Sequence, residues 1–481
     1  MSIGKQALKG VIFVTLSNNI VFLFSFVANN IILARLLPIE AFGQFALATF
    51  FVSLVGRVRE LGFDYAVVHA KQDLVKIGSV YLTLQILLGV LVAILTVPAS
   101  LLVSEFYGVE VGLATLLLGF GYLITNIYNS LNALFDKELR FQESAVIGVV
   151  STAVSILGMV IMGLGGYGLW SLIIGGIPGS ILGLLLLFAK LKFSYHWDLD
   201  PEIVKWFYSF GPWWHWFISA TASLLVFQFD NFIVGNIVGL SVLGFYTRAY
   251  SWATMPTSRI TAIISKVAFP VYARLQEDKE KLSKAFSLTL STIALLTIPL
   301  SLVSVLVIRE AILVLVGEKW LDMIPLFYLL LGYMLLRPIF DDAGALLTAV
   351  GKPKIINTAQ LIQSGVMISV TTLLVYLYGG IGAPIGVGIV MMAGVGYLYR
   401  HLLAVVDVNP LKIFLVPSFC GLVSLVVTFY LKKFFFLSFE PLITLILTGM
   451  SFSVCYIGLI VALKGRSIYK QMIDFRKVFV E

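Results

Sequence analysis

Several charged side chains lie inside long apolar stretches of this chain, where they could bind an ionic ligand. Arg248 and Arg259 lie in one such stretch, and Asp230 lies in the stretch before it. A charge at the depth of a bilayer costs roughly 3 kcal/mol or more, so it usually faces a cavity or a partner. The two arginines are eleven residues apart, about three turns, and project from nearly the same face of a helix. Together they could hold the oxygens of a phosphate group in a central cavity.

Each of these residues also has a purely structural interpretation. Arg259 is close enough to the end of its predicted helix to extend its guanidinium into water. Asp230 and Arg248 each lie about nine residues from Gly239, so they reach similar depths on adjacent antiparallel helices. They form a structural ion pair, or else Asp230 is part of a site for a coupling ion.

Two further pairs of charged residues carry similar alternatives. Arg337 and Asp341 are four residues apart on one predicted helix, a spacing typical of a structural ion pair; a role in ion coupling is the alternative. Arg57 and Arg59 end an apolar stretch. They line the mouth of a cavity, or they only fix the orientation of the chain in the membrane.

Motifs of enzymes and metal sites are weak in this sequence. Asp198-Leu199-Asp200 resembles a metal-binding Asp-x-Asp motif, but Asp200 precedes Pro201 and suits the cap of a short helix better. The four histidines form no ligand spacing with one another, and no Walker loop is present. We therefore expect no catalytic residue, no metal ion, no cofactor and no enzymatic activity.

The elements that must position these residues are membrane helices. Of the 481 residues, 59% are hydrophobic and 12% are charged, whereas a soluble protein has about 25% charged residues. Because a membrane helix needs about 20 apolar residues, the sequence predicts an all-α integral membrane protein of about fourteen helices. Their expected centres lie near Val21, Phe51, Val90, Leu117, Ser155, Ile177, Leu224, Met255, Thr297, Met334, Ile368, Ile389, Val423 and Phe452. After Asp200, a short helix with an apolar stripe is expected to lie in the membrane surface and to join the two halves of the chain.

The distribution of basic residues predicts the orientation. Most of the 33 Lys and Arg fall on one side of the predicted helices if the N-terminus is cytoplasmic. Such a bias favours an even number of spans with both termini in the cytoplasm. It also accounts for the net charge of +8 without a nucleic-acid partner.

An internal repeat organises the chain. Shifting by 201 residues places Asn30 on Asn231 and Gly43 on Gly244, in the stretches VANNIILARLLPIEAFGQFALA and FQFDNFIVGNIVGLSVLGFYTRAY. We interpret the chain as two tandem lobes, 1–200 with a cytoplasmic linker and 201–410, followed by two helices and a basic tail at 411–481. Because each lobe has six helices, the lobes form a parallel pseudo-two-fold repeat.

Five segments spread over both halves carry a resemblance to a known family. They are LARLLPIEAFGQFALA (33–48), LGFDYAVVHAKQDL (61–74), ALFDKELRFQESA (133–145), DNFIVGNIVGLSVLGFYTRAY (230–250) and ISKVAFPVYARLQEDKEKL (264–282). With them the chain resembles the polysaccharide transporter (PST, Wzx-like) branch of the MOP exporters, over roughly residues 1–410. The resemblance implies a two-lobed bundle around a cavity that alternates between the membrane faces.

The resemblance also implies a function in the bacterial plasma (inner) membrane. Members of the family flip undecaprenyl-diphosphate-linked oligosaccharides outward for O-antigen, capsule or exopolysaccharide assembly. Arg248, Arg259 and Arg57, with Arg59, would then bind the diphosphate. Asn30 and Asn126 would bind sugar hydroxyls, or they would only bridge helices. Membrane lipids and a polysaccharide polymerase or export protein are the expected partners.

Two other functions compete with this one. A cation-coupled drug or small-molecule antiporter of the same fold would have twelve helices and a cavity rich in carboxylates. A membrane polymerase or ligase acting on the same lipid-linked sugars would carry a long outer loop with charged catalytic residues, whereas every predicted outer connection here is short.

Overall fold

The described chain is almost entirely helical. The computed structural model describes residues 17, 19–71, 74–192, 194–210 and 213–479, and these contain helices, turns and loops but no β-strand. Among the described residues, twelve helical stretches are long and apolar enough to cross a membrane, including Asn19–Leu36 and Pro441–Gly465. The prediction of an all-α, multi-pass membrane protein is therefore confirmed. Residues 1–16, on which the predicted location of the N-terminus depends, lie outside the described residues.

The predicted number of fourteen helices is not established by these twelve stretches. Met255 lies in α12 (Leu240–Arg274), a long helix that contains Pro256 and Pro270 and is not one of the twelve. The other difference is that Ile368 and Ile389 share one stretch, Pro353–Leu402. Each of the other predicted centres lies in a stretch of its own.

The stretch Pro353–Leu402 folds back on itself as a helical hairpin. A methyl group on Gly386 would lie 2.6 Å from the Thr371 side chain, and one on Gly394 would lie 2.2 Å from Gln363. The later glycine, Gly394, meets the earlier partner, Gln363, and the earlier glycine, Gly386, meets the later partner, Thr371. This order is that of two antiparallel helices. Glycine allows their backbones to approach closely, as small residues do at membrane helix interfaces.

Contacts divide the chain into two compact units. The first comprises residues 1–235 with 239–244, and the second comprises 236–238 with 245–481. The first unit contains, in chain order, η1 (Ala28–Ile32), α2 (Leu33–Leu36), α3 (Ile39–Gly56), η2 (Arg57–Arg59), α4 (Phe63–His69), α5 (Leu74–Tyr107), α6 (Val109–Lys137), α7 (Phe141–Leu164), α8 (Leu169–Ile173), α9 (Ile177–Ala189), α10 (Pro201–Ser209) and most of α11 (Trp213–Ile237). The predicted lobe boundaries at residues 200 and 410 follow from the internal repeat rather than from contacts, and they stay predictions.

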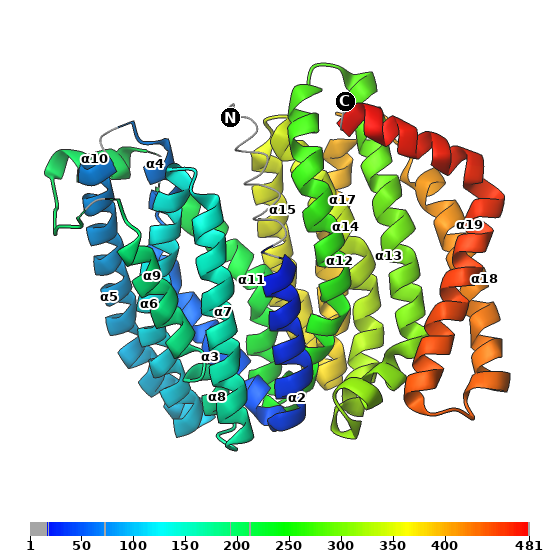
Figure 1. Cartoon of the computed structure of the whole chain (residues 1–481), viewed down its shortest axis with the longest axis horizontal. Helices are drawn as coiled ribbons and strands as arrows, with labels where there is room; N and C mark the ends of the chain where they lie inside the picture. Colours follow the sequence, from blue (N-terminus) through cyan, green and yellow to red (C-terminus); the bar gives the residue numbers. More distant parts are fainter. Residues whose placement is uncertain (1–16, 18, 72–73, 193, 211–212, 480–481) are drawn as a thin grey trace. The chain divides into compact units, whose positions relative to one another are not determined.

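The second unit contains the remaining helices. After the first turns of α12 they are α13 (Lys279–Leu315), η3 (Glu318–Met323), α14 (Ile324–Ala349), α15 (Pro353–Val366), η4 (Met367–Thr371), α16 (Thr372–Tyr378), η5 (Gly379–Ile381), α17 (Gly382–Leu402), α18 (Pro410–Leu431), η6 (Lys432–Phe436) and α19 (Pro441–Phe479). Helices α18 and α19 pack beside α13 (Figure 1). The Lys432 ammonium donates to Glu310 of α13 at 2.8 Å, and only 15% and 9% of these side chains are exposed.

The start of α12 belongs to the first unit and packs against the start of α3. A methyl group on Gly43 would lie 2.0 Å from the carbonyl oxygen of Leu240, and one on Gly244 would lie 2.3 Å from that of Ile39. The Ser241 hydroxyl donates to a Glu40 carboxylate oxygen at 2.9 Å. Only glycine permits this backbone approach on both helices.

Helix α10 closes one end of the first unit's core. The Asp200 carboxylate accepts from the backbone N–H groups of Glu202 and Ile203, so the predicted cap is confirmed. The apolar stripe differs from the prediction, because Ile203 and Phe207 are buried in the protein core rather than facing lipid. The Phe207 ring lies 5.4 Å from that of Phe63 on α4.

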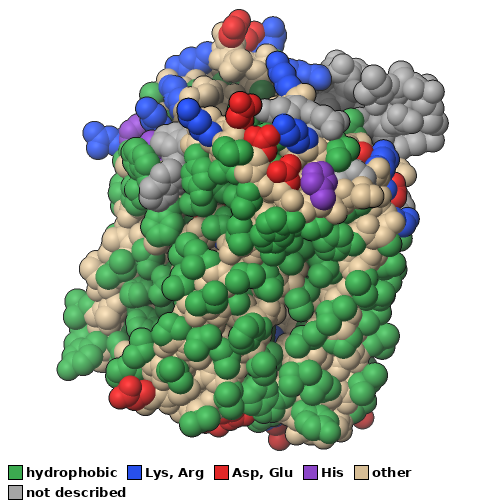
Figure 2. Space-filling view, turned by 90° about the vertical axis from the view of Figure 1, so that its left-hand side faces the viewer, with side chains coloured by type: hydrophobic (Ala, Val, Ile, Leu, Met, Phe, Trp, Pro, Cys, Tyr) green, Lys and Arg blue, Asp and Glu red, His purple; other side chains and the backbone are tan. Residues whose placement is uncertain are grey.

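Helices α4 and α10 lie at the same end of the first unit (Figure 1). Figure 2 shows Lys and Arg at the upper end of one face, while hydrophobic side chains cover most of the surface below. Arg140 forms ion pairs with Glu138 and Glu143 at this end, at 2.9 and 2.8 Å. The apolar surface below is what a lipid-facing protein needs.

Candidate functional site

The site is built where α3 ends and the chain turns into α4. The α3 helix continues into η2, which carries Arg57 and Arg59. Gly62 then adopts a left-handed conformation with φ +80°, which is costly for other residues. A methyl group on Gly62 would also lie 2.7 Å from the indole nitrogen of Trp216. The turn therefore brings Arg59, α4 and the start of α11 together within the first unit.

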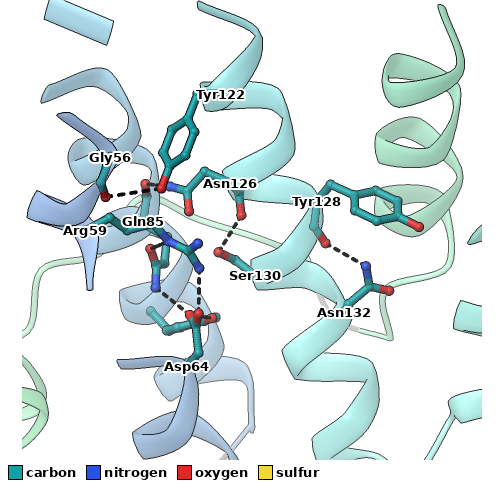
Figure 3. A network of polar contacts seen from close by, with 10 residues as sticks. Gly56, Arg59, Asp64, Gln85, Tyr122, Asn126, Tyr128, Ser130 and Asn132 are labelled. Atoms are coloured by element: carbon teal, nitrogen blue, oxygen red, sulfur yellow. Dashed lines mark hydrogen bonds and ion pairs between the residues drawn. The ribbon is translucent and has the colours of Figure 1, made fainter. Parts of the chain in front are cut away.

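Arg59 is the buried cation of this site, with 9% of the residue exposed. Its Nε donates to the Gln85 Oε1 at 3.1 Å, and its terminal nitrogen donates to the Asp64 Oδ2 at 2.6 Å (Figure 3). Asp64 accepts two further hydrogen bonds, from the Tyr81 hydroxyl at 2.5 Å and from the Gln85 Nε2 at 2.8 Å. Arg59 is thus neutralised by a carboxylate, and Gln85 holds both partners in place.

Asn126 joins the same network from α6. Its Nδ2 donates to the backbone carbonyl of Gln85 at 2.6 Å, while its backbone carbonyl accepts from Ser130 (Figure 3). The structure therefore brings together two of the predicted site residues, Arg59 and Asn126, on either side of Gln85. Within the described residues, the buried Oδ1 of Asn126 has no hydrogen-bond partner. The contact to Gln85 connects α6 with α5, as expected of an asparagine that bridges helices.

Arg57 is held differently from Arg59. Its Nε donates to the carbonyl of Ser53 at 3.0 Å, and a terminal nitrogen donates to the carbonyl of Ala220 at 3.4 Å. Both partners are neutral, and among the ion pairs between described residues none involves Arg57. The positive charge of Arg57 is therefore not balanced by a bonded carboxylate.

A cavity of about 210 Å³ opens beside Arg59. Its lining combines the charged pair Arg59 and Asp64 with the aromatic rings of Tyr65 and Trp216. These rings are stacked, with centroids 4.7 Å apart and planes 19° apart. The polar part of the lining is completed by Glu60, Gln85, Ser219 and Ser223. A few polar groups converging on an apolar wall are typical of a small-molecule site.

A second charged cluster lies within the second unit. The Arg337 Nε donates to both carboxylate oxygens of Asp341, at 2.9 and 3.0 Å, so the pair predicted from the spacing forms. Arg337 also donates to the Tyr333 hydroxyl at 2.9 Å, which accepts from Tyr250 as well. Whether this pair also serves ion coupling stays a prediction.

The remaining predicted residues fall in separate places. Arg248 and Arg259 are half-buried on the part of α12 that belongs to the second unit. Asp230 lies in α11 of the first unit, is 3% exposed and accepts from the N–H of Asn231 at 2.9 Å. Because Asp230 and Arg248 belong to different units, their ion pair stays a prediction, as does the phosphate-binding role of the two arginines. Asn30 is 5% exposed in η1.

Several residues of the two clusters were not found from the sequence. Asp64 lies only five residues after Arg59, so this spacing was a usable signal. Gln85 and Tyr81 are polar residues in the apolar helix α5, but nothing in the sequence connects them with Arg59. Asp342 of the second unit does stand out in the sequence, as a second carboxylate beside Asp341 in an apolar stretch; it is fully buried and accepts from Tyr272 and Thr289, both at 3.0 Å.

Comparisons with known proteins place the chain among membrane proteins of polysaccharide assembly. A family model described as polysaccharide biosynthesis protein matches residues 32–325. The lipopolysaccharide biosynthesis protein WzxC of Escherichia coli is 25% identical over 372 residues, which cover 74% of this chain and 72% of that protein.

Two solved structures show the fold. A structure of the lipid II flippase MurJ in an inward closed conformation has a TM-score of 0.76 and 19% identity, covering 95% of this chain and all of that one. An inward-facing multidrug resistance transporter of the MATE family has a TM-score of 0.65 and 16% identity, covering 79% of this chain and 94% of that one. The fold of this chain is thus similar to the folds of these two structures.

Proposed function

Because the chain belongs to the family of polysaccharide biosynthesis proteins, we propose that it is a flippase for undecaprenyl-diphosphate-linked oligosaccharides in the bacterial plasma membrane. The substrate enters from the cytoplasmic leaflet, its head group crosses between the lobes by alternating access, and its lipid tail stays in the bilayer. The observation that carries the proposal is a polar cavity with a charge pair at the end of membrane helix α3, beside an arginine that forms no ion pair with a carboxylate among the described residues. A guanidinium without a carboxylate partner can bind an anion such as a phosphate.

The diphosphate is bound by arginines in this proposal. Arg57 is close to the cavity, because it donates to the carbonyl of Ala220, which lines that cavity. Arg248 and Arg259, which are about three turns apart on α12, would bind the diphosphate after it leaves Arg57. A guanidinium suits this task because it can give two parallel hydrogen bonds to phosphate oxygens.

A lipid analysis tests the proposal. In a strain that lacks the gene, we expect intact lipid-linked oligosaccharide to accumulate in the cytoplasmic leaflet. The wild-type gene should relieve the accumulation, and Arg248→Ala should not. Arg274→Ala is the matched control, since Arg274 is an exposed arginine on the same helix, and it should behave as wild type. Unpolymerised single units in the outer leaflet would instead favour a polymerase or ligase, and unchanged lipids would favour drug export.

The similarity in fold to the MATE transporter, which covers 79% of this chain, supports the antiporter alternative. The similarity in fold to the flippase MurJ covers 95% of this chain and supports the flippase proposal.

Ion coupling is compatible with both functions, and Asp230 or the pair Arg337–Asp341 would serve it. If a Na⁺ or H⁺ gradient or the membrane potential drives flipping, collapsing these gradients in proteoliposomes will stop it. Flipping that continues after the collapse would show that none of these gradients is the energy source.

The orientation belongs to the proposal as well. We propose that both termini lie in the cytoplasm, and the bias of Lys and Arg toward one side of the predicted helices supports this orientation. In a background without Cys420 and Cys455, a membrane-impermeant maleimide should label Tyr167→Cys but not Lys192→Cys in intact cells. These positions are matched, since 59% of Tyr167 and 61% of the Lys192 side chain are exposed. The reverse labelling would contradict the orientation.

A polysaccharide polymerase or export protein is the proposed partner on the outer side.

A further inference from the structure

We infer that the cavity beside Arg59 is a subsite for one uncharged sugar ring, and that it does not bind the diphosphate. The inference rests on the proposed function, because it assigns a part of the same lipid-linked substrate to this cavity. It differs from the expectation that Arg59 binds phosphate alongside Arg57, which stays a prediction.

The charges of the lining exclude a phosphate group. Among the described residues of the lining Arg59 is the one cation, and these residues also include two carboxylates, Asp64 and Glu60. Two of the guanidinium's nitrogens are already engaged, by Gln85 at 3.1 Å and by Asp64 at 2.6 Å. An anionic ligand would meet a net negative lining and would have to displace a bonded carboxylate. Like charges in such proximity disfavour binding.

The shape and chemistry of the lining suit a pyranose instead. The stacked rings of Tyr65 and Trp216 form a wall against which the C–H face of a sugar can pack. Tyr65 is 59% exposed, so its ring remains accessible at the cavity. The Asp64 carboxylate, whose side chain is 40% exposed, and the hydroxyls of Ser219 and Ser223 offer the donors and acceptors that sugar hydroxyls require.

The volume limits the ligand to one ring. Pockets for drug-sized ligands measure roughly 300–1,000 Å³, whereas this cavity measures about 210 Å³. The ring that is attached directly to the diphosphate fits best. Arg57 donates to the carbonyl of Ala220, a residue of the cavity lining, and can hold the adjoining diphosphate at the edge.

Binding to the full-length protein in nanodiscs tests the subsite. The probes are undecaprenyl diphosphate alone, the same lipid bearing one N-acetylglucosamine, and the same lipid bearing one uronic acid. We expect the wild type to bind the neutral sugar lipid most tightly. Trp216→Leu and Tyr65→Leu should raise the Kd for this lipid about tenfold, as the loss of a stacking wall implies. Neither variant should change the Kd for the sugar-free lipid. Arg57→Gln should weaken the binding of all three lipids.

Matched variants separate the subsite from general damage. Trp214→Leu alters an exposed tryptophan on the same helix outside the lining, and Tyr167→Leu alters a tyrosine whose exposure of 59% equals that of Tyr65. Both should bind as wild type does. Trp216→Phe and Tyr65→Phe keep the rings and should keep most of the affinity, with an unchanged elution profile on gel filtration.

The outcomes distinguish this inference from the proposed function. If the wild type binds none of the three lipids, the proposed function is wrong, and the subsite falls with it. If the wild type binds them but Trp216→Leu weakens the sugar-free lipid as much as the neutral sugar lipid, only the sugar subsite is wrong. Tightest binding of the uronic acid lipid would likewise overturn the uncharged specificity.

Discussion

Gly43 and Gly244 make a reciprocal contact: each lies against a backbone carbonyl at the start of the other's helix. The two carbonyls belong to Leu240 and Ile39, and the 201-residue shift that aligns the two glycines also aligns these two residues. The contact therefore obeys the internal repeat, as an interface around a two-fold axis does.

Gly43→Ala should destabilise the protein. Its methyl group would lie 2.0 Å from a carbonyl oxygen, so α3 and α12 must move apart. Overpacking of this kind costs about 1–3 kcal/mol, and we expect a lower midpoint of thermal unfolding in detergent. Gly121→Ala is the control, because its methyl group would have no neighbour within 4 Å, and it should be neutral or stabilising. Equal midpoints for the two variants would contradict the packing argument.

Arg59→Met should destabilise the first unit, because it leaves Asp64 without its cation. Removing one partner of a buried ion pair costs roughly 3–5 kcal/mol. The Asp64 side chain is 40% exposed, so we expect a smaller loss, about 2 kcal/mol. The free energy of unfolding should recover in part in the double variant Arg59→Met/Asp64→Asn, which leaves no unpaired charge. Lys281→Met removes the cation of an exposed pair and should change little.

Tyr272→Phe should destabilise the second unit. Asp342 is fully buried, and the variant removes one of the two hydroxyls that donate to it. Leaving a buried acceptor partly unsatisfied costs about 1–3 kcal/mol. Tyr376→Phe is the control, since 75% of Tyr376 is exposed. If both variants unfold at the wild-type temperature, the hydrogen bonds of Asp342 contribute nothing to stability.

The stability of α10 should decrease in acid, because protonation removes the charge of the Asp200 carboxylate. The ammonium of Lys76, at 2.6 Å, and the backbone N–H of Glu202 hold the pKa of the Asp200 carboxyl below its usual range. A lowered pKa in the folded state stabilises the fold above the unfolded pKa, and this contribution is lost as the pH falls through the folded pKa. Trp206 fluorescence, which reports α10, should therefore show that Asp200→Ala loosens this helix at neutral pH.

The difference between wild type and Asp200→Ala should shrink in acid, below the usual range of an aspartate. Asp200→Asn separates the two contributions of the carboxylate, because asparagine caps a helix about as well but cannot pair with Lys76. Its effect should be smaller than that of alanine at neutral pH. A pH-independent difference for the alanine variant would show that the charge of Asp200 has no role.

The sequence predicted the parts of the fold that depend on local patterns. Long apolar stretches gave the membrane helices, Asp200 before Pro201 gave the cap of α10, and the spacing of Arg337 and Asp341 gave their ion pair. The repeat aligned Gly43 with Gly244 because close backbone packing permits only glycine there. Each of these signals lies within a few residues of its consequence, or is repeated in the chain.

The rest depends on which helices become neighbours. Gln85 reaches Arg59 only because α5 packs beside the end of α3, and Trp216 reaches Gly62 only because α11 begins there. Periodicity shows that one face of α10 is buried, but it does not show whether that face packs against lipid or against protein. For this reason the apolar stripe of α10 was assigned to the membrane surface. The predicted helices centred at Ile368 and Ile389 lie in one continuous helical stretch, Pro353–Leu402, because the turn between them, η5, is itself helical.

The ion pair between Lys432 and Glu310 bears on how the protein is made. While the first 409 residues are being inserted, Glu310 near the end of α13 has not yet met the lysine that will neutralise it, and the α13 surface that α18 and α19 will cover still faces lipid. Helices α18 and α19, which are synthesised after α13, supply both the missing charge and the missing cover. We therefore expect a chain terminated before Pro410 to accumulate in the membrane at a lower level than the full chain.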